Sequence, residues 1–198
     1  MKKLNRILTV LSVLGLVGIL VFLSTAAPVD AQTSTMLSMS PSPYFACVGE
    51  NTVIYIRVTN VVNLQAYDVT GSFTPANNQV IAISNIENGG WLTPSFTMFP
   101  TWNNTSGTFG LVGVKTASPG NTGDGNLIKI TFQALVPGQT VYFTIDEPTG
   151  AVLSNGNGVK IPFTTPAGYD GVVYTRPAGT CNPTEVKIKY LKTNRKPY

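Results

Sequence analysis

The chain has 198 residues, contains no histidine, and carries 13 Lys and Arg residues against 9 Asp and Glu residues. The basic excess belongs to its two ends, because residues 32–184 hold five basic and seven acidic side chains, whereas residues 185–198 hold five and one. A nucleic-acid groove needs Lys and Arg clustered on one face, so the body of the chain argues against a nucleic-acid partner. Without His, the chain also lacks the side chain most often used as a base near neutral pH.

Residues 1–31 have the layout of a signal peptide. Three basic residues precede an apolar run over 7–22, and a small-x-small pattern at 29–31 lies before Gln32. We expect cleavage before Gln32 and a secreted or cell-surface product of a length that suits one domain. The alternative is an uncleaved anchor, because residues 7–27 approach the ~20 residues that span a bilayer. Membrane contact is expected only through this segment.

Cys47 and Cys181 are the only cysteines, one near each end of the expected mature domain. Disulfides persist in exported proteins, so we expect these two residues to be bonded, the alternative being two separate buried thiols. Two cysteines in a chain without His do not supply the three or four N or S ligands of a zinc site. No metal and no cofactor are expected.

Three segments of the mature chain, 53–58, 128–134 and 141–145, alternate apolar and polar residues, which predicts strands with one buried and one exposed face. The predicted core residues on these strands are Ile54, Ile56, Val58, Ile128, Ile130, Phe132, Val141, Phe143 and Ile145. Further strands are expected at 64–73, 80–86, 108–114, 159–163 and 171–175, and residues 36–39 could pair as an edge strand. Turns are expected in the Gly- and Asn-rich segments 119–126 and 154–158. Eight or nine short strands fit two packed antiparallel sheets.

The stretch 91–102 contains both tryptophans and two of the phenylalanines. If these rings are exposed, they can stack on sugar rings or anchor a protein partner. The alternative is that they seal one end of the core. The candidate binding residues are therefore Trp91, Phe96, Phe99 and Trp102.

No catalytic residues are expected. Asp146 and Glu147 are adjacent, but neighbouring residues on a strand point to opposite faces, so they are a poor pair for glycoside hydrolysis. A solvated strand end is the simpler interpretation. Asp124 could ligate calcium through oxygen, and an ordinary turn is the alternative there.

Five segments, taken in order, resemble those of the cohesin family. They are VGENTV (48–53) with IRVTNVVNLQAY (56–67), FTP (73–75) leading to Ile81, GTFGLVG (107–113), GDG (123–125) with LIKITFQA (127–134), and LSNGNGVKIP (153–162). The resemblance implies an all-β fold, an antiparallel jelly-roll β-sandwich of about nine strands. It would span residues 44–184, after a flexible lead-in at 32–43.

The resemblance also implies a non-catalytic extracellular module, linked to polysaccharide breakdown, that binds a dockerin-like protein. The alternatives are a carbohydrate-binding module with a polysaccharide ligand and a cell-surface structural or attachment protein. The chain departs from the family pattern in its cysteine pair, its aromatic stretch and its basic C-terminal tail at 185–198. That tail is either a solvated extension or an attachment segment, since residues 185–191 alternate like a strand.

Overall fold

The computed structural model describes residues 34–181, apart from 77, 147–149 and 169. The expected signal segment with its cleavage site, Glu147 and the basic tail lie outside these described residues. No helix in the described part of the chain is long and apolar enough to cross a membrane. The described residues form strands β1 (Met36–Ser40), β2 (Tyr44–Cys47), β3 (Asn51–Thr74), β4 (Ile81–Asn88), β5 (Ser95–Asn103), β6 (Thr108–Lys115), β7 (Asn121–Ala134), β8 (Thr140–Ile145), β9 (Ala151–Asn155), β10 (Lys160–Ile161) and β11 (Gly171–Arg176).

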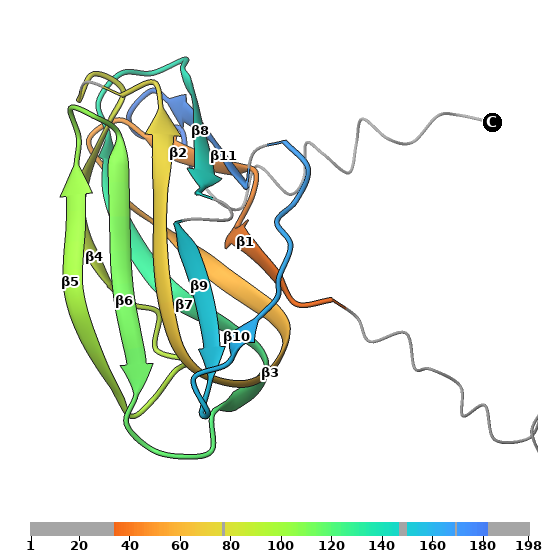
Figure 1. Ribbon diagram of the computed structural model, residues 1–198. Coiled ribbons are helices and arrows are strands. Elements are labelled where there is room, and N and C mark those ends of the chain that lie inside the picture. Colours follow the sequence, from red (N-terminus) through yellow and green to blue (C-terminus); the bar gives the residue numbers. More distant parts are fainter. Residues whose placement is uncertain (1–33, 77, 147–149, 169, 182–198) are drawn as a thin grey trace, which may run out of the picture. The chain divides into compact units, whose positions relative to one another are not determined.

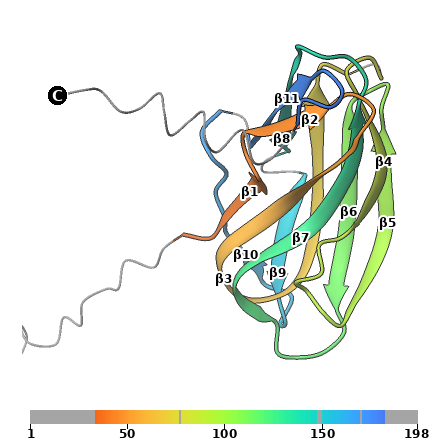
Figure 2. The same cartoon turned by 180° about the vertical axis from the view of Figure 1, so that it is seen from behind.

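The long strand β3 belongs to both layers of a sandwich (Figures 1 and 2). Its first half pairs with β1 on one edge and with β7 on the other, and β4 continues this layer beyond β7. Its second half pairs with β6, which carries β5, and on the opposite edge with β9 and β8. The strand bends between these halves at Asn60 and Asn63, both at positive φ, a conformation that Asn tolerates better than most residues.

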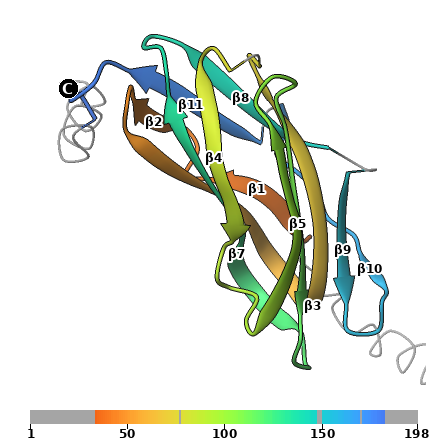
Figure 3. The same cartoon turned by 90° about the vertical axis from the view of Figure 1, so that its left-hand side faces the viewer.

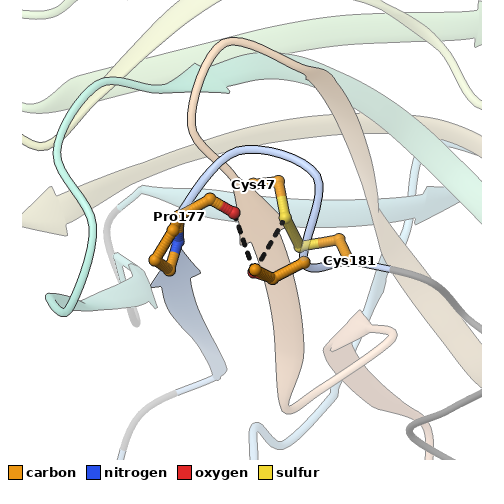
Figure 4. The surroundings of a disulfide bond; sticks show 4 residues. Cys47, Pro177 and Cys181 are labelled. Carbon is orange, nitrogen blue, oxygen red and sulfur yellow. Dashed lines mark hydrogen bonds between the residues drawn. A yellow bond between two sulfur atoms is a disulfide. The ribbon is translucent and has the colours of Figure 1, made fainter.

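Strands from the two ends of the domain lie side by side. β11 pairs antiparallel with β8 and parallel with β2 (Figure 3). This N-terminal to C-terminal pairing closes the jelly roll. Next to it, a disulfide joins Cys47 at the end of β2 to Cys181, with the two Cα atoms 5.6 Å apart (Figure 4). The predicted disulfide is therefore confirmed.

The predicted core is confirmed, because all nine alternating apolar residues are buried. Phe143 lies at its centre, with its ring centroid 5.8 Å from that of Phe73 and 6.1 Å from those of Phe109 and Phe132. A polar link also crosses the core: the Tyr67 hydroxyl of β3 donates a hydrogen bond of 2.9 Å to the Leu127 carbonyl of β7. Burial raises the pKa of this hydroxyl, which therefore stays protonated.

The turn expected at 119–126 is wrong beyond Gly120, because β7 already begins at Asn121. These residues follow the bend of β3, with two register shifts that the Gly- and Asn-rich sequence accommodates. Asp124 is therefore a strand residue. Its carboxylate accepts a hydrogen bond from the backbone N–H of Asn60 at the bend and contacts Arg57 at 3.3 Å.

Strand boundaries differ from the prediction in three other ways. The segments expected as two strands, 53–58 and 64–73, are one continuous strand, because the bend of β3 keeps its pairing. Of the strand expected at 159–163, only Lys160–Ile161 pairs, and β2, β5 and β9 had no sequence prediction. Residues 36–39 pair with β3 as the edge strand β1, which was the alternative to a flexible lead-in. Leu37 and Met39 of this strand are buried.

Candidate functional site

The candidate site is the outer surface of β5, β6, β3 and β9, which lie side by side in Figure 1. In β3, β6 and β9, core residues alternate with residues that point away from the core. Together with one side of β5, these outward residues make up the front face: Ala66, Asp68, Thr70, Ser72, Phe96, Met98, Thr101, Asn103, Thr108, Gly110, Val112, Val114, Val152 and Ser154.

Two cross-strand rows at one end of the front face are mainly apolar. The first row runs from Phe96 through Val114 and Ala66 to Ser154. The second row runs from Met98 through Val112 and Asp68 to Val152. Phe96 is exposed, and the other apolar side chains of these rows are partly exposed. Contiguous apolar surface of this kind marks interaction sites.

The other end of the front face consists of polar residues and one glycine. Thr101, Gly110 and Thr70 form the next row, and Asn103, Thr108 and Ser72 the row after it. Gly110 is buried between the threonine side chains of its row, since a Cβ there would lie 3.1 Å from Thr70 Cγ2 and 3.2 Å from the Thr101 hydroxyl oxygen. The face therefore changes from mainly apolar at one end to polar at the other.

Asp68 is the charged residue within these rows, and it is exposed between Val112 and Val152. A carboxylate framed by aliphatic side chains offers a directional acceptor inside an apolar surface. Lys160 lies at the margin, on β10 opposite Ser154. The face therefore suits a partner with complementary donors or a positive charge near its centre.

The sequence-predicted aromatic residues do not act as one group. Phe96 and Phe99 are 59% and 72% exposed and Trp102 is 38% exposed, all on the edge strand β5. A register shift lies between Met98 and Thr101, where Phe99 has a φ of 56°. Beyond this shift, the residues of β5 that face outward are the odd-numbered ones instead of the even-numbered ones. Phe96 thus lies opposite outward-facing Val114, whereas Trp102 lies opposite buried Phe109.

Trp91 is placed differently from the other three. It is half-buried, packs against the core and covers Gly125, where an added Cβ would lie 1.9 Å from Trp91 Cδ2. Asn121 donates a hydrogen bond to its carbonyl. Trp91 therefore packs against the core, as the alternative interpretation of the aromatic stretch expected. A binding role for Phe96, Phe99 and Trp102 remains a prediction.

Sequence analysis missed most of the front face, including Met98, Asp68, Val112 and Val152. A usable signal existed in β6, where Val112 and Val114 are apolar at outward positions between buried residues. Apolar residues on both faces of a predicted strand indicate either a second buried face or an interaction surface.

Other charged side chains form ion pairs within the domain, as Lys129 and Glu87 do. Lys129 donates a hydrogen bond to Glu87 and lowers the pKa of that carboxyl, while Glu87 raises the pKa of Lys129. No group of three or more Cys, Asp or Glu residues within the described ranges could hold a metal ion by such side chains alone. Asp170 is an exception among the carboxyl groups, because it is buried and burial raises its pKa.

The described residues thus define a jelly-roll β-sandwich with a mixed apolar and polar sheet face. No family model and no curated protein sequence matches the chain. Solved structures of cohesin domains do match the chain. The fold of this chain is the cohesin fold, as the sequence resemblance implied.

Three solved structures illustrate the likeness. A non-cellulosomal cohesin from Archaeoglobus fulgidus aligns with a TM-score of 0.57 and 15% identity over 80% of this chain and 99% of its own. The sixth cohesin of Acetivibrio cellulolyticus scaffoldin B, in complex with a Cel5 dockerin, has a TM-score of 0.58 and 12% identity over 73% and 100%. The cohesin of a Clostridium thermocellum OlpC cohesin–dockerin complex has a TM-score of 0.56 and 12% identity, over 75% of this chain and 99% of its own. At these identities the likeness is one of fold.

Proposed function

We propose that this chain is an exported, non-catalytic module that binds a protein partner of the dockerin type on its front face. The observation that carries the proposal is the pair of rows in which apolar side chains surround Asp68. Protein interfaces combine such an apolar centre with a polar rim. The front face has the same composition, with threonine and serine side chains beyond the apolar rows.

Two further findings support a protein partner. Cohesins with this fold have been solved bound to dockerins. The disulfide also agrees with an extracellular location, where such bonds persist. Export through residues 1–31 and the domain limits of 44 and 184 remain part of the proposal.

A polysaccharide ligand is the second candidate, because Phe99 and Phe96 are well exposed. A glycan platform needs rings in one plane that stack on successive sugars. The bulge in β5 places Phe96 and Trp102 on opposite sides of the strand, so these rings do not form such a row. The geometry therefore favours a protein over a glycan.

Binding measurements with front-face variants test the proposal. The immobilised full chain is exposed to purified dockerin modules and to culture filtrate of the organism that encodes it. Replacing both Phe96 and Met98 by Ala should weaken binding at least about tenfold, since buried interface anchors cost more than ~1 kcal/mol each. Asp68→Asn should weaken it about fivefold or more through loss of a charged acceptor.

The matched control is Val136→Ala, which removes an exposed apolar side chain from the turn between β7 and β8. It should leave affinity unchanged. Cellulose and xylan are tested in parallel with Phe99→Ala. Binding of a polysaccharide that fails in Phe99→Ala, with no protein partner lost in the front-face variants, would establish the glycan function instead.

A further inference from the structure

The pairing of β8 with β3 ends at Ile145 and that of β9 with β3 begins at Ala151. At this interruption, the Thr70 N–H of β3 donates a hydrogen bond to the Gly150 carbonyl, and the Asp146 N–H donates one to the Thr70 carbonyl. A cavity of about 750 Å³ opens beside this interruption. Thr70, Asp146, Gly150, Thr165 and Asp170 are among its lining residues. The cavity lies apart from the apolar rows that carry the proposed partner binding, although it shares Thr70 with the polar end of the front face.

Asp170 is the most unusual group in this cavity. The residue is only 4% exposed, at the start of β11. Its Oδ2 accepts a hydrogen bond from the Ile145 N–H, and the Thr165 side chain lies close enough to the carboxyl group to lower its pKa, against the larger effect of burial. The buried Oδ1 has no hydrogen bond within normal geometry. Buried polar atoms almost always have a partner, so an orphaned carboxylate oxygen on a residue that lines a cavity needs an explanation.

Asp146 and Gly150 add further acceptors to the same cavity. The Thr70 hydroxyl lies 3.2 Å from Asp146 Oδ2 and 2.9 Å from the Gly150 carbonyl oxygen. A hydroxyl has one proton, so it cannot satisfy both oxygens fully. The Gly150 carbonyl also accepts the Thr70 backbone N–H at 2.6 Å, so the Asp146 carboxylate is the acceptor that the shared hydroxyl leaves only partly paired.

The lining described for the cavity contains two carboxylates but neither Lys nor Arg. Elsewhere in the described residues, Asp124 and Glu87 each form an ion pair with a basic side chain. Asp146 and Asp170 have no such partner within the described ranges. The cavity therefore combines uncompensated negative charge with an orphaned acceptor.

We propose that this cavity binds a calcium ion through Asp170 Oδ1 and the Asp146 carboxylate. The Gly150 carbonyl and the Thr70 hydroxyl are the neutral oxygens available to complete the coordination, together with water. Calcium accepts six to eight oxygen ligands in flexible geometry, backbone carbonyls and water among them, which matches a lining that offers two carboxylates and several threonine hydroxyls. A bound ion would supply the missing partner of Asp170 and tie β11 to the interruption between β8 and β9.

Thermal unfolding of the full chain with calcium chloride tests this site. At a calcium concentration about a hundredfold above Kd, the Tm should rise by about 5–10 °C relative to the chain in chelator. Isothermal titration should show one site per chain. Asp170→Asn and Asp146→Asn should each abolish the rise, whereas Glu50→Gln, which neutralises an exposed carboxylate in the turn before β3, should keep it.

The two aspartate variants also separate an ion site from a merely structural role. The amide introduced by Asp170→Asn would retain an oxygen for the Ile145 N–H, so this variant should fold and, in chelator, should melt at or above the temperature of the unaltered chain. Asp146 is exposed, so Asp146→Asn should melt in chelator like the unaltered chain. No calcium-dependent rise in the unaltered chain, or a rise that survives in both aspartate variants, would overturn the proposal.

Discussion

Replacing Gly113 by Ala is expected to destabilise the sandwich by overpacking its core at one position. Gly113 lies on the inner face of β6, opposite Tyr67 of β3. An added Cβ would lie 2.4 Å from Tyr67 Cζ and 2.6 Å from its hydroxyl oxygen. Favourable contacts between carbon atoms occur at about 3.5–4.0 Å, so the ring would have to move by roughly 1 Å.

Tyr67 has little freedom to make that movement. Its ring is buried, and its hydroxyl is held by the Leu127 carbonyl across the core. Overpacking a tight core costs about 1–3 kcal/mol, and losing the hydrogen bond adds about 0.5–1.5 kcal/mol. The Leu127 carbonyl also accepts from the Gly89 N–H, so it would not be left without a partner. The lower conformational freedom of Ala in the unfolded chain offsets about 0.5–1 kcal/mol.

The expected net loss is therefore about 2–3 kcal/mol in the free energy of unfolding, measured by urea denaturation of the oxidised protein. Gly156→Ala is the control, because a Cβ there would meet nothing closer than 3.5 Å. A double variant with Tyr67→Leu should recover much of the loss, since the ring is the obstacle. A loss below about 0.5 kcal/mol for Gly113→Ala, or full additivity in the double variant, would refute this account of the packing.

Two further predictions concern the stability of the domain. Replacing Cys47 and Cys181 by Ser should lower the stability by up to about 5 kcal/mol, because the bond closes a loop with a sequence separation of 134; mass spectrometry of alkylated, non-reduced protein should find no free thiol in the unaltered chain. Phe143→Ala should cost about 3–5 kcal/mol in urea denaturation, since this ring touches three other buried rings. A cost near that of an exposed Val136→Ala would show that the site collapses around the lost ring.

Local patterns predicted much of the fold, because alternation along a strand depends only on neighbouring residues. Ile54, Phe132 and Phe143 are buried as their two-residue period indicated. The same reasoning failed for residues 121–126, whose Gly and Asn content is typical of a turn. Pairing with the bent β3 overrode that local preference, which is the usual limit of propensity in sheets.

The sequence by itself determined the all-β class, the core face of the main strands and the pairing of two cysteines, since each follows from composition or short-range periodicity. Only the tertiary structure decided the sites. The register shift within β5 separates Phe96 from Trp102, and cross-strand register gathers Asp68 with apolar residues of β6 and β9. Asp146 and Asp170 likewise meet at one cavity only because β11 returns beside β8. Such contacts depend on which strands pair and in which register, and the sequence of a single segment predicts neither.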